Sequence, residues 1–432
     1  MSVSRGDTPP EIAGAEIQEH RLRNGLRVLT LERHLDPVVA VMLYYRVGAR
    51  DEQEHEAGLS HFLEHMMFKG SANFQKGEVD RRVTALGGSI NAFTTPDHTA
   101  YWFELASDRW EIALEIEADR MSQLSLDEAE FDSERAVVLE ELSMGEDDPW
   151  RNLTHQVQEV LFPRHPYRRP VIGYADVLQH LTVADMRDFY GRFYGPDNAT
   201  LVLSGAVEPK SALKLVRKHF GSIARRSGPD ARPGFRHTHL EPRGERRLTT
   251  RWDDPAARLC MAWPTAAFTT EDDFALDLAA TVLSSGRLSR LYRRIVLERG
   301  LATSISANND ARVDGGSFWI MAQCVQGVAP EDLERAIDEE ISLLCDKLVG
   351  AAEFSRAKKS LAAAAAYEGE TVTDLAEDIG AYAVDADWPL ALERTASRNR
   401  VTSSRMRACV QRYLTPQRRV LGWSLPDTVA AR

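Results

Sequence analysis

His61-Phe62-Leu63-Glu64-His65 says more about this chain than any other stretch of its sequence. Two histidines four residues apart lie on one face of a helix, with about 5–6 Å between their Cβ atoms. Both imidazoles can therefore reach a single metal ion. Glu64 flanks the same face, where it is placed to act as a base on metal-bound water and not to fill a coordination site. We predict a helix that carries His61 and His65 as metal ligands and Glu64 as general base.

The residues around the motif favour this interpretation over a surface helix with two partly exposed histidines. Ser60 precedes the motif and is a candidate helix start. Met66-Met67-Phe68 follows it, so we expect the helix to be buried on its other sides. A buried imidazole without a partner is costly, and metal ligation accounts for two of them.

A third protein ligand is expected, because a catalytic zinc ion usually holds three protein ligands and a water molecule. The acidic stretch 127–148 supplies many candidates, most of which are expected to be solvated helix surface. Glu134 and Glu141 differ from the others because they are seven residues apart and share one helix face. Val137 and Val138 lie between them. A carboxylate in such an apolar segment is either paired with a cation or bound to a metal.

Together these segments resemble the pitrilysin and mitochondrial processing peptidase family of zinc peptidases, in which H-x-x-E-H is the inverzincin signature. The segments 87–95, Gly-Gly-Ser-Ile-Asn-Ala-Phe-Thr-Thr, and 97–101, Asp-His-Thr-Ala-Tyr, are similar to the family's substrate-binding edge strand. Gly173 and the run from Tyr194 to Gly205 also fit. The resemblance covers essentially the whole chain.

The resemblance implies a ligand set and a role for each carboxylate. His61, His65 and Glu141 would bind one Zn²⁺ per chain, and Glu64 would be the general base. Glu134 would contact one of the ligands without binding the metal and would set the orientation of that ligand.

The resemblance also implies how the substrate is held. An extended peptide would pair with the edge strand at Ser89, Asn91, Ala92 and Phe93, where main-chain hydrogen bonds give affinity with little sequence preference. One of two homologous domains would keep the zinc, and the other would close over the peptide.

The second half of the chain departs from the family pattern. Active members usually place an Arg there and, a few residues later, a Tyr, both of which reach the substrate. Arg294 matches the Arg, but Thr303 stands near the place of the Tyr. The alternative for Arg290, Arg294 and their neighbours is a solvated helix face. We therefore predict that this chain is the zinc-bearing subunit of a pair whose homologous partner supplies the missing residues, with a homodimer as the alternative.

The expected activity is that of a zinc metalloendopeptidase which hydrolyses peptides or unfolded segments within a closed chamber. The alternative is a non-catalytic structural or assembly subunit of the same fold. The presence of His61, Glu64, His65 and Glu141 together favours the peptidase. A closed structural zinc site has no use for a base such as Glu64.

Composition narrows the class of protein. The chain has 432 residues, 43% of them hydrophobic and 27% charged, which is ordinary for a globular protein of two or more domains. The net charge of −12 argues against nucleic acid as a partner. We expect no membrane-spanning segment and no secretory signal, hence a cytoplasmic protein, or a periplasmic one if a signal has been removed. The four cysteines are expected to be reduced: Cys260, Cys324, Cys345 and Cys409.

The sequence repeats itself over a long period. Leu181-Thr-Val-Ala-Asp-Met-Arg187 is matched by Val401-Thr-Ser-Ser-Arg-Met-Arg407, and Pro196 is matched by Pro416. Both copies predict a capped helix, a proline stop and an apolar strand. Self-similarity at this period indicates two homologous domains.

We place a catalytic zinc-binding domain at 1–224 and a homologous domain without zinc at 248–432. The linker between them, 225–247, is rich in Arg, Gly and Pro near its start. Each domain is predicted to be an α/β sandwich, a mixed sheet with helices packed on one face, which makes the fold class α+β. The expected strands include 38–46, 101–105, 200–203, 257–263 and 317–322, and the expected helices include 113–123, 271–283 and 330–348.

Overall fold

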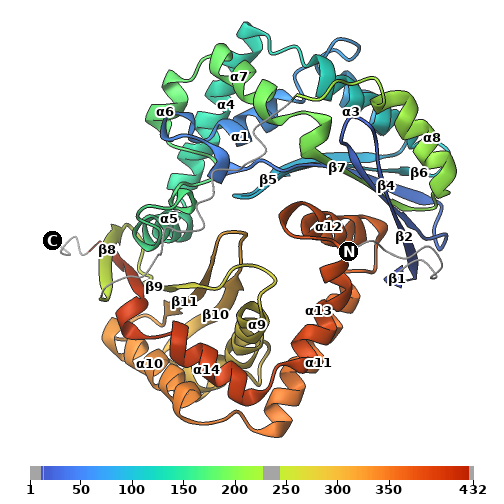
Figure 1. Ribbon diagram of the computed structural model, residues 1–432. Helices are drawn as coiled ribbons and strands as arrows, with labels where there is room; N and C mark the ends of the chain where they lie inside the picture. The colour runs from blue at the N-terminus through green and yellow to red at the C-terminus, as the bar shows by residue number, and fades with distance from the viewer. Residues whose placement is uncertain (1–10, 13, 227–243, 428–432) are drawn as a thin grey trace. The chain divides into compact units, whose positions relative to one another are not determined.

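The structure, a computed structural model, describes residues 11–12, 14–226 and 244–427, which form two compact units. The first unit comprises Met1–Leu142, Pro170–Pro233 and Ala366–Leu392. The second unit comprises Ser143–Arg169, Gly234–Ala365 and Glu393–Arg432. Each unit has its own sheet and its own apolar core, so the predicted two-domain α+β fold is confirmed (Figure 1).

The first unit is built on a seven-stranded mixed sheet in the order β1-β2-β3-β7-β4-β6-β5. Its strands are β1 (Glu11–Ile12), β2 (Ala15–Arg21), β3 (Arg27–Glu32), β4 (Val38–Tyr45), β5 (Ser89–Thr94), β6 (Thr99–Ala106) and β7 (Ala199–Gly205). Neighbouring strands run antiparallel except β3 and β7, which are parallel. A parallel pair needs a long crossover, and most helices of this unit lie in that connection.

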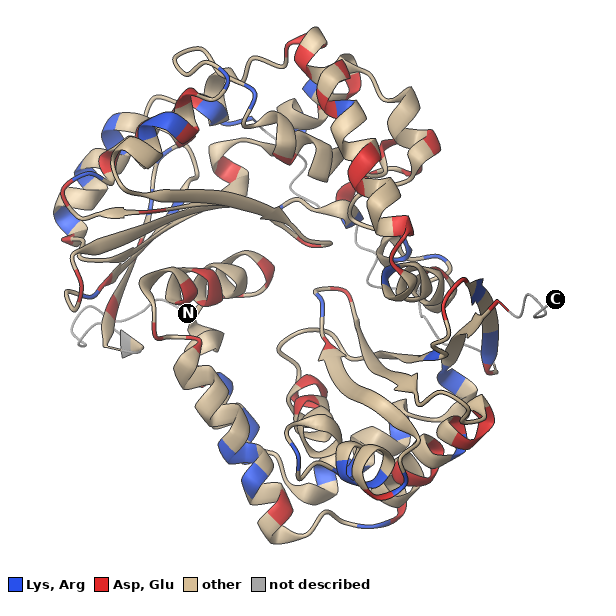
Figure 2. Cartoon of the chain, turned by 180° about the vertical axis from the view of Figure 1, so that it is seen from behind, with Lys and Arg blue, Asp and Glu red and all other residues tan. Residues whose placement is uncertain are grey.

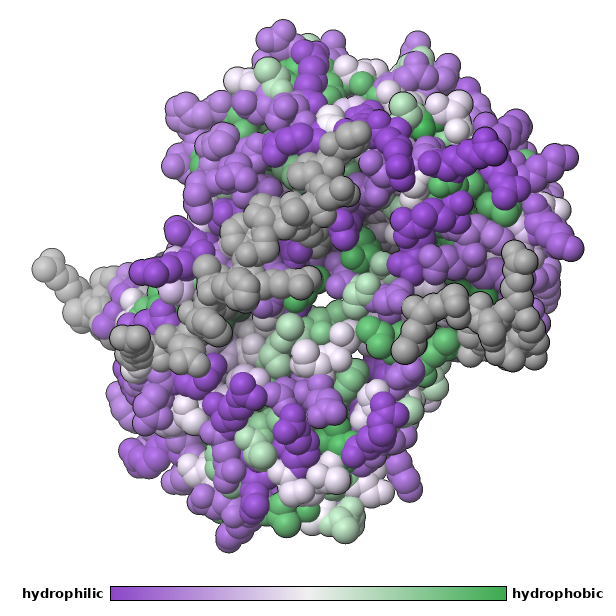
Figure 3. All heavy atoms as spheres, viewed as in Figure 1, coloured by the Kyte–Doolittle hydropathy of each residue, from purple (hydrophilic) through white to green (hydrophobic). Residues whose placement is uncertain are grey.

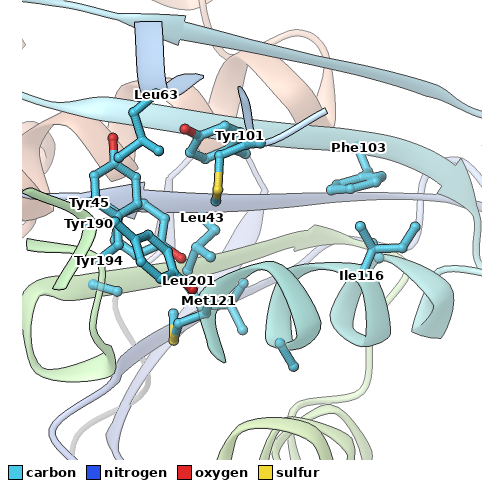
Figure 4. Packing of buried hydrophobic residues seen from close by; sticks show 14 of the residues in the cluster. Leu43, Tyr45, Leu63, Tyr101, Phe103, Ile116, Met121, Tyr190, Tyr194 and Leu201 are labelled. Carbon is cyan, nitrogen blue, oxygen red and sulfur yellow. The ribbon is translucent and has the colours of Figure 1, made fainter. Parts of the chain in front are cut away.

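One face of this sheet carries the main core of the unit. The helices are α1 (Leu59–Met66), α2 (Glu78–Ala85), α3 (Glu111–Gln123), α4 (Glu128–Glu146), α6 (Ala175–His180), α7 (Val183–Phe193), α8 (Pro209–Phe220) and α12 (Val372–Asp385). Alternate residues of β4, such as Leu43 and Tyr45, point into this core with Leu63 of α1 and Tyr101 of β6 (Figure 4). The period of two in the strand therefore decides which residues meet the helices.

The other face of the same sheet is covered by α12, which comes from the second half of the chain (Figure 1). Here Tyr44 faces the helix and its hydroxyl donates to the carbonyl of Glu377 at 3.0 Å. A Cβ on Gly380 would lie 2.1 Å from the Tyr44 ring, so only glycine permits this approach. The prediction that helices pack on one face only is wrong in this detail.

Acidic residues are prominent on α12 (Figure 2). The neighbouring sheet supplies cations to both ends of this segment. Arg27 forms an ion pair with Asp387 at 2.8 Å, and Arg33 donates to the carbonyls of Gly369 and Glu370. The segment is thus held by charge as well as by apolar contact.

The second unit repeats the arrangement with a five-stranded sheet in the order β10-β11-β9-β12-β8. Its strands are β8 (Arg246–Trp252), β9 (Arg258–Thr265), β10 (Ala302–Asp310), β11 (Gly316–Cys324) and β12 (Val420–Pro426). The helices that lie wholly or largely in it are α5 (Pro149–Leu161), α9 (Glu271–Ser284), α10 (Pro330–Asp346), α11 (Ala351–Tyr367), α13 (Pro389–Arg400) and α14 (Ser403–Tyr413), with a π-helical turn η5 at Tyr292–Glu298.

Helix α5, from the first half of the chain, covers one face of this second sheet. Leu153, Val157 and Leu161 recur every four residues and are fully buried, so they form the stripe that meets β9 and β12. A Cβ on Gly422 of β12 would lie 2.5 Å from a methyl group of Val157. Glycine permits the close approach here too, but from the strand and not from the helix.

These two helices make the division of the chain discontinuous. The predicted boundaries, 1–224 and 248–432, assign α5 to the first domain and α12 to the second, whereas each packs within the other unit. Most of the predicted linker, residues 227–243, lies outside the described residues.

The internal repeat has a structural counterpart. Thr182 caps α7 by accepting from the backbone N–H of Asp185, and Thr402 caps α14 by accepting from Arg405. A short 3₁₀ turn begins at Pro196 after the first helix and at Pro416 after the second. Strands β7 and β12 follow and occupy the same place in their sheets.

Figure 3 shows many hydrophilic side chains on the visible face, with apolar ones among them. The buried apolar residues form a separate core in each unit. All four cysteines are free thiols, as expected. Among the described residues, none of the helices combines the length and the apolar character that crossing a membrane requires.

Candidate metal centre

The candidate site begins with α1, the helix that the motif predicts. It starts at Leu59, after Gly58 with φ of 95°, and Ser60 is not the cap. The Glu52 carboxylate accepts from the N–H groups of Gly58 (2.9 Å) and Ser60 (2.7 Å). A buried anion therefore satisfies the donors at the start of this short helix and fixes its position.

Three side chains from two helices converge at one point. His61 and His65 of α1 and Glu141 of α4 each offer one ligand atom, and these atoms all lie within 4.8 Å of one another. His65 Nε2 is 3.5 Å from Glu141 Oε2, and His61 Nε2 is 3.9 Å from the same oxygen. No other such group of three occurs among the described residues.

The separations suit a metal ion. Ligand atoms about 2.0–2.2 Å from a tetrahedral zinc ion are roughly 3.3–3.6 Å apart, close to the 3.5 and 3.9 Å that separate the two imidazoles from Glu141. Two imidazoles and a carboxylate also form a usual donor set for zinc. The Glu141 side chain is 36% exposed, so the cluster is open to solvent on one side. The arrangement could hold a metal ion and leave a coordination position for water.

Glu134 lies behind His65, where the resemblance implied a carboxylate that orients a ligand. Its Oε1 is 2.9 Å from His65 Nδ1. When Nδ1 carries the proton and donates to Glu134, the lone pair of Nε2 faces Glu141 and the cluster. Lys69 completes this chain of contacts, with Nζ 2.5 Å from Glu134 Oε2. Lys69 was not predicted, because it lies beyond the end of α1 at Met66 and no helical spacing links it to Glu134.

Glu64 is half-buried beside the cluster, between the two histidines in sequence. Its Oε2 accepts a hydrogen bond of 2.5 Å from the Thr94 hydroxyl. Burial raises the pKa of the Glu64 carboxyl and the charge of Glu141 adds to this, whereas the Thr94 hydrogen bond and His65 lower it. Thr94 was also missed: it lies in the segment 87–95 that resembles the family's edge strand, but no spacing rule links it to Glu64.

Strand β5 forms one edge of the first sheet among the described strands, with β6 as its neighbour. Ser89 and Asn91 are exposed, and Ala92 and Phe93 are half-buried. The Asn91 side chain accepts from the N–H of Ala92 at 2.9 Å. The edge is available for strand addition, and peptide binding by these four residues stays a prediction.

The arginine predicted for substrate contact lies in the second unit. Arg294 in η5 forms an ion pair with Glu340 (3.1 Å), and Arg290 pairs with Glu353 (2.8 Å). Thr303, near the place of the expected Tyr, donates to the carbonyl of Gln323 at 3.3 Å. Both arginines thus have acidic partners within their own unit, and a role in catalysis for Arg294 stays a prediction.

Two family models match the chain in succession. Residues 27–174 match the model described as insulinase (peptidase family M16), and residues 180–361 match the one described as peptidase M16 inactive domain. His61, His65 and Glu141 all lie within the first match.

Curated relatives include an uncharacterized zinc protease of Mycobacterium leprae, 33% identical over 344 residues, or 79% of this chain and 76% of the relative. Zinc protease PqqE of Helicobacter pylori is 31% identical over 330 residues, or 76% of this chain and 73% of the relative.

Solved structures of similar fold include a protease from Helicobacter pylori, with a TM-score of 0.90 and 26% identity over 95% of this chain and all of that one. An M16-like peptidase from Alicyclobacillus acidocaldarius has a TM-score of 0.85 and 23% identity, covering 96% of this chain and 99% of that one.

Proposed function

Because this chain belongs to peptidase family M16, we propose that it is a zinc metallopeptidase whose ion is held by His61, His65 and Glu141. The observation that carries the proposal is the convergence of these three ligand atoms within 4.8 Å, beside the unligated carboxylate of Glu64. A purely structural metal site needs no such carboxylate. The names of the relatives support zinc as the metal.

Each residue of the proposed site has its own role in peptide hydrolysis. A bound zinc ion supplies Lewis-acid activation of water and of the peptide carbonyl. Glu64 accepts the proton from the attacking water and returns it to the nitrogen of the leaving amine. Glu134 and Lys69 hold the His65 ring in the orientation that ligation requires. The open edge of β5 takes the peptide as an added strand, which brings its main chain next to Glu64.

A non-catalytic role for the chain has one point of support, the description of the second matched model as an inactive domain. That match covers residues 180–361, whereas the ligands and the base all lie in residues 27–174. The full set of His61, Glu64, His65 and Glu141 therefore favours catalysis.

The proposal includes a partner. Arg294 is already paired with Glu340, and a threonine stands at position 303, so this stretch of the second unit does not offer the expected pair of Arg and Tyr to the substrate. A homologous subunit would supply them. Activity of the purified chain alone, at a level that added homologue does not raise, would count against this part of the proposal.

The test is peptide cleavage by the purified chain, with and without a homologous subunit, and with zinc content measured on the same sample. We expect cleavage that a chelator abolishes and zinc restores. Glu64→Gln should keep its zinc and lose about 10²- to 10⁴-fold in turnover. Glu140→Gln, an exposed neighbour on α4, is the matched control and should behave as the parent chain. Full turnover by Glu64→Gln would refute the assignment of the base.

A further inference from the structure

The contact between Thr94 and Glu64 joins the edge strand to the proposed base. Thr94 is the last residue of β5, and its hydroxyl donates to Glu64 Oε2 at 2.5 Å. Both residues lie in the first unit, and α1 packs against β5 there. This hydrogen bond occupies one of the two carboxylate oxygens of Glu64.

The turn after Thr94 is tightly hydrogen-bonded. The Thr95 hydroxyl accepts from the N–H groups of Asp97 (3.1 Å) and His98 (2.9 Å), and the Thr95 N–H donates to the His98 carbonyl (2.8 Å). This closes a small ring of contacts over four residues. The backbone on the C-terminal side of Thr94 is therefore fixed.

The same turn is braced from outside by η1 (Ala49–Asp51). Ala49 and Arg50 donate from their N–H groups to the carbonyls of Thr95 (3.2 Å) and Pro96 (3.0 Å). Arg50 also forms a buried ion pair with Asp97 at 2.9 Å. Gly48 lies so close that a Cβ there would be 2.4 Å from the Thr95 carbonyl oxygen.

A third brace comes from α12. His98 Nδ1 is 2.8 Å from Asp385 Oδ2, and the His98 ring packs edge-on against Phe93 and Tyr44. The two ends of β5 therefore differ: Ser89 and Asn91 are exposed at the start, while Thr94 is held by a braced turn at the end. A hydroxyl on such a rigid support can fix the direction of the group that it contacts.

We propose that Thr94 is a positioning residue that holds the Glu64 carboxylate by Oε2 and leaves Oε1 to take the proton of the attacking water. The proposal rests on the proposed function. It adds that the strand that receives the peptide also sets the direction of the base, so that substrate and base share one rigid support.

The chemistry explains why one oxygen must be held. A carboxylate that turns about its terminal bond presents its basic oxygen to the water for only part of the time. A hydroxyl donor to the other oxygen removes that freedom without taking a proton away, because a neutral hydroxyl donates a hydrogen bond and keeps its proton. Loss of a hydrogen bond to a charged group, or a displacement of the base by about 1 Å, costs on the order of 10- to 100-fold in rate.

The test compares Thr94→Val, which removes the hydroxyl at nearly constant volume, with Thr94→Ser, which keeps it. Thr30→Val is the matched control, because Thr30 is a buried strand residue of the same unit whose hydroxyl makes only a 3.5 Å contact with the Gln18 carbonyl. Zinc content, kcat and KM are measured for all three, and the crystal structure of Thr94→Val is determined without metal.

We expect Thr94→Val to keep its zinc and its KM within about a factor of two and to lose about 10- to 100-fold in kcat. Thr94→Ser should restore most of the rate, and Thr30→Val should leave it unchanged. In the crystal structure of Thr94→Val, the Glu64 carboxylate should move away from the position that it has in the parent chain.

Unchanged kcat in Thr94→Val, or a carboxylate that stays in place without the hydroxyl, would overturn the proposal. A parent chain that neither binds zinc nor cleaves peptides would refute the proposed function instead. The crystal structure would still decide whether Thr94 positions Glu64, because it needs neither metal nor turnover.

Discussion

Both units have a similar contact between a helix and the edge strand of the sheet, which we call the junction. The two junctions differ in the side chains that surround their acidic residues. In each sheet, a helix precedes the edge strand and places a carboxylate against a polar side chain of that strand. In the first unit, Glu64 of α1 meets Thr94 of β5. In the second unit, Asp273 and Asp277 of α9 both accept from the Asn309 amide of β10, at 2.8 and 2.9 Å.

The difference lies in what balances the charge. Arg398 closes the second junction with two contacts to Asp277 Oδ2, at 2.9 and 2.6 Å, so the charge of one acid is already met by a side chain. In the first junction Glu64 and Glu141 lie beside two imidazoles, and the nearby Lys69 is engaged by Glu134. The same arrangement can therefore pair its acidic side chains with an arginine, as in the second unit, or place them beside two histidines, as in the first.

The largest expected effect comes from removing a ligand in the first junction. Glu141→Gln should weaken zinc binding by about 100-fold or more, because it removes both the anionic ligand and its charge. Asp277→Asn, the corresponding change in the second junction, should leave zinc affinity unchanged, as should Glu140→Gln. Competition with a chelator measures all three. Equal losses in Glu141→Gln and Glu140→Gln would mean that charge alone, not ligation, had been measured.

A smaller effect is expected from substitutions that test how tightly α12 and α5 pack. Each of these helices packs on the sheet formed mainly by the other half of the chain. Gly380→Ala in α12 and Gly422→Ala under α5 should each destabilise the protein by about 1–3 kcal/mol, because the new methyl groups meet Tyr44 and Val157. Gly191→Ala in α7 meets nothing within 4 Å and should stabilise by up to about 1 kcal/mol. Thermal unfolding compares the three, and a stabilising Gly380→Ala would contradict the close packing of α12.

The smallest effect is a pH dependence in the second junction. Burial, aided by the charge of Asp277, raises the pKa of Asp273 from 3.8 to about 7. Between these values the folded state keeps a proton that the unfolded state has lost, so stability falls as pH rises from about 4 to 7 and is level above that. The side chain introduced by Asp273→Asn cannot ionise, so this variant does not have this loss of stability over that pH range.

Relative to the parent chain, Asp273→Asn should therefore gain on the order of 1 kcal/mol between pH 6 and pH 8. Denaturant unfolding at both values measures the change, and constant effects of the substitution cancel in the comparison. A difference in stability that does not vary with pH would show that Asp273 is ionised throughout.

Local spacing predicted the part of the site that lies on one helix. His61, Glu64 and His65 follow from the helical period, and the structure places them on α1 as expected. Glu141 lies on another helix, so the residues alone could mark it as a candidate, and only the family resemblance implied which acid meets the histidines. Lys69 and Thr94 make contacts that depend on tertiary packing and carry no sequence pattern of their own.

The same limit explains the domain boundaries. The repeat around Thr182 and Thr402 predicted two like units because it preserves caps, turns and strands. The stripe of Leu153, Val157 and Leu161 shows that α5 must bury one face, but periodicity does not say against which sheet. The exchange of α5 and α12 could therefore not be predicted from amphipathic pattern.

The most direct test of the central claim is anomalous diffraction at the zinc absorption edge from crystals of the full chain grown with zinc. We expect an anomalous peak among His61, His65 and Glu141 and none among Asp273, Asp277 and Asn309. An empty first junction, or a peak in the second, would contradict the claim that only the first junction is left for a metal ion.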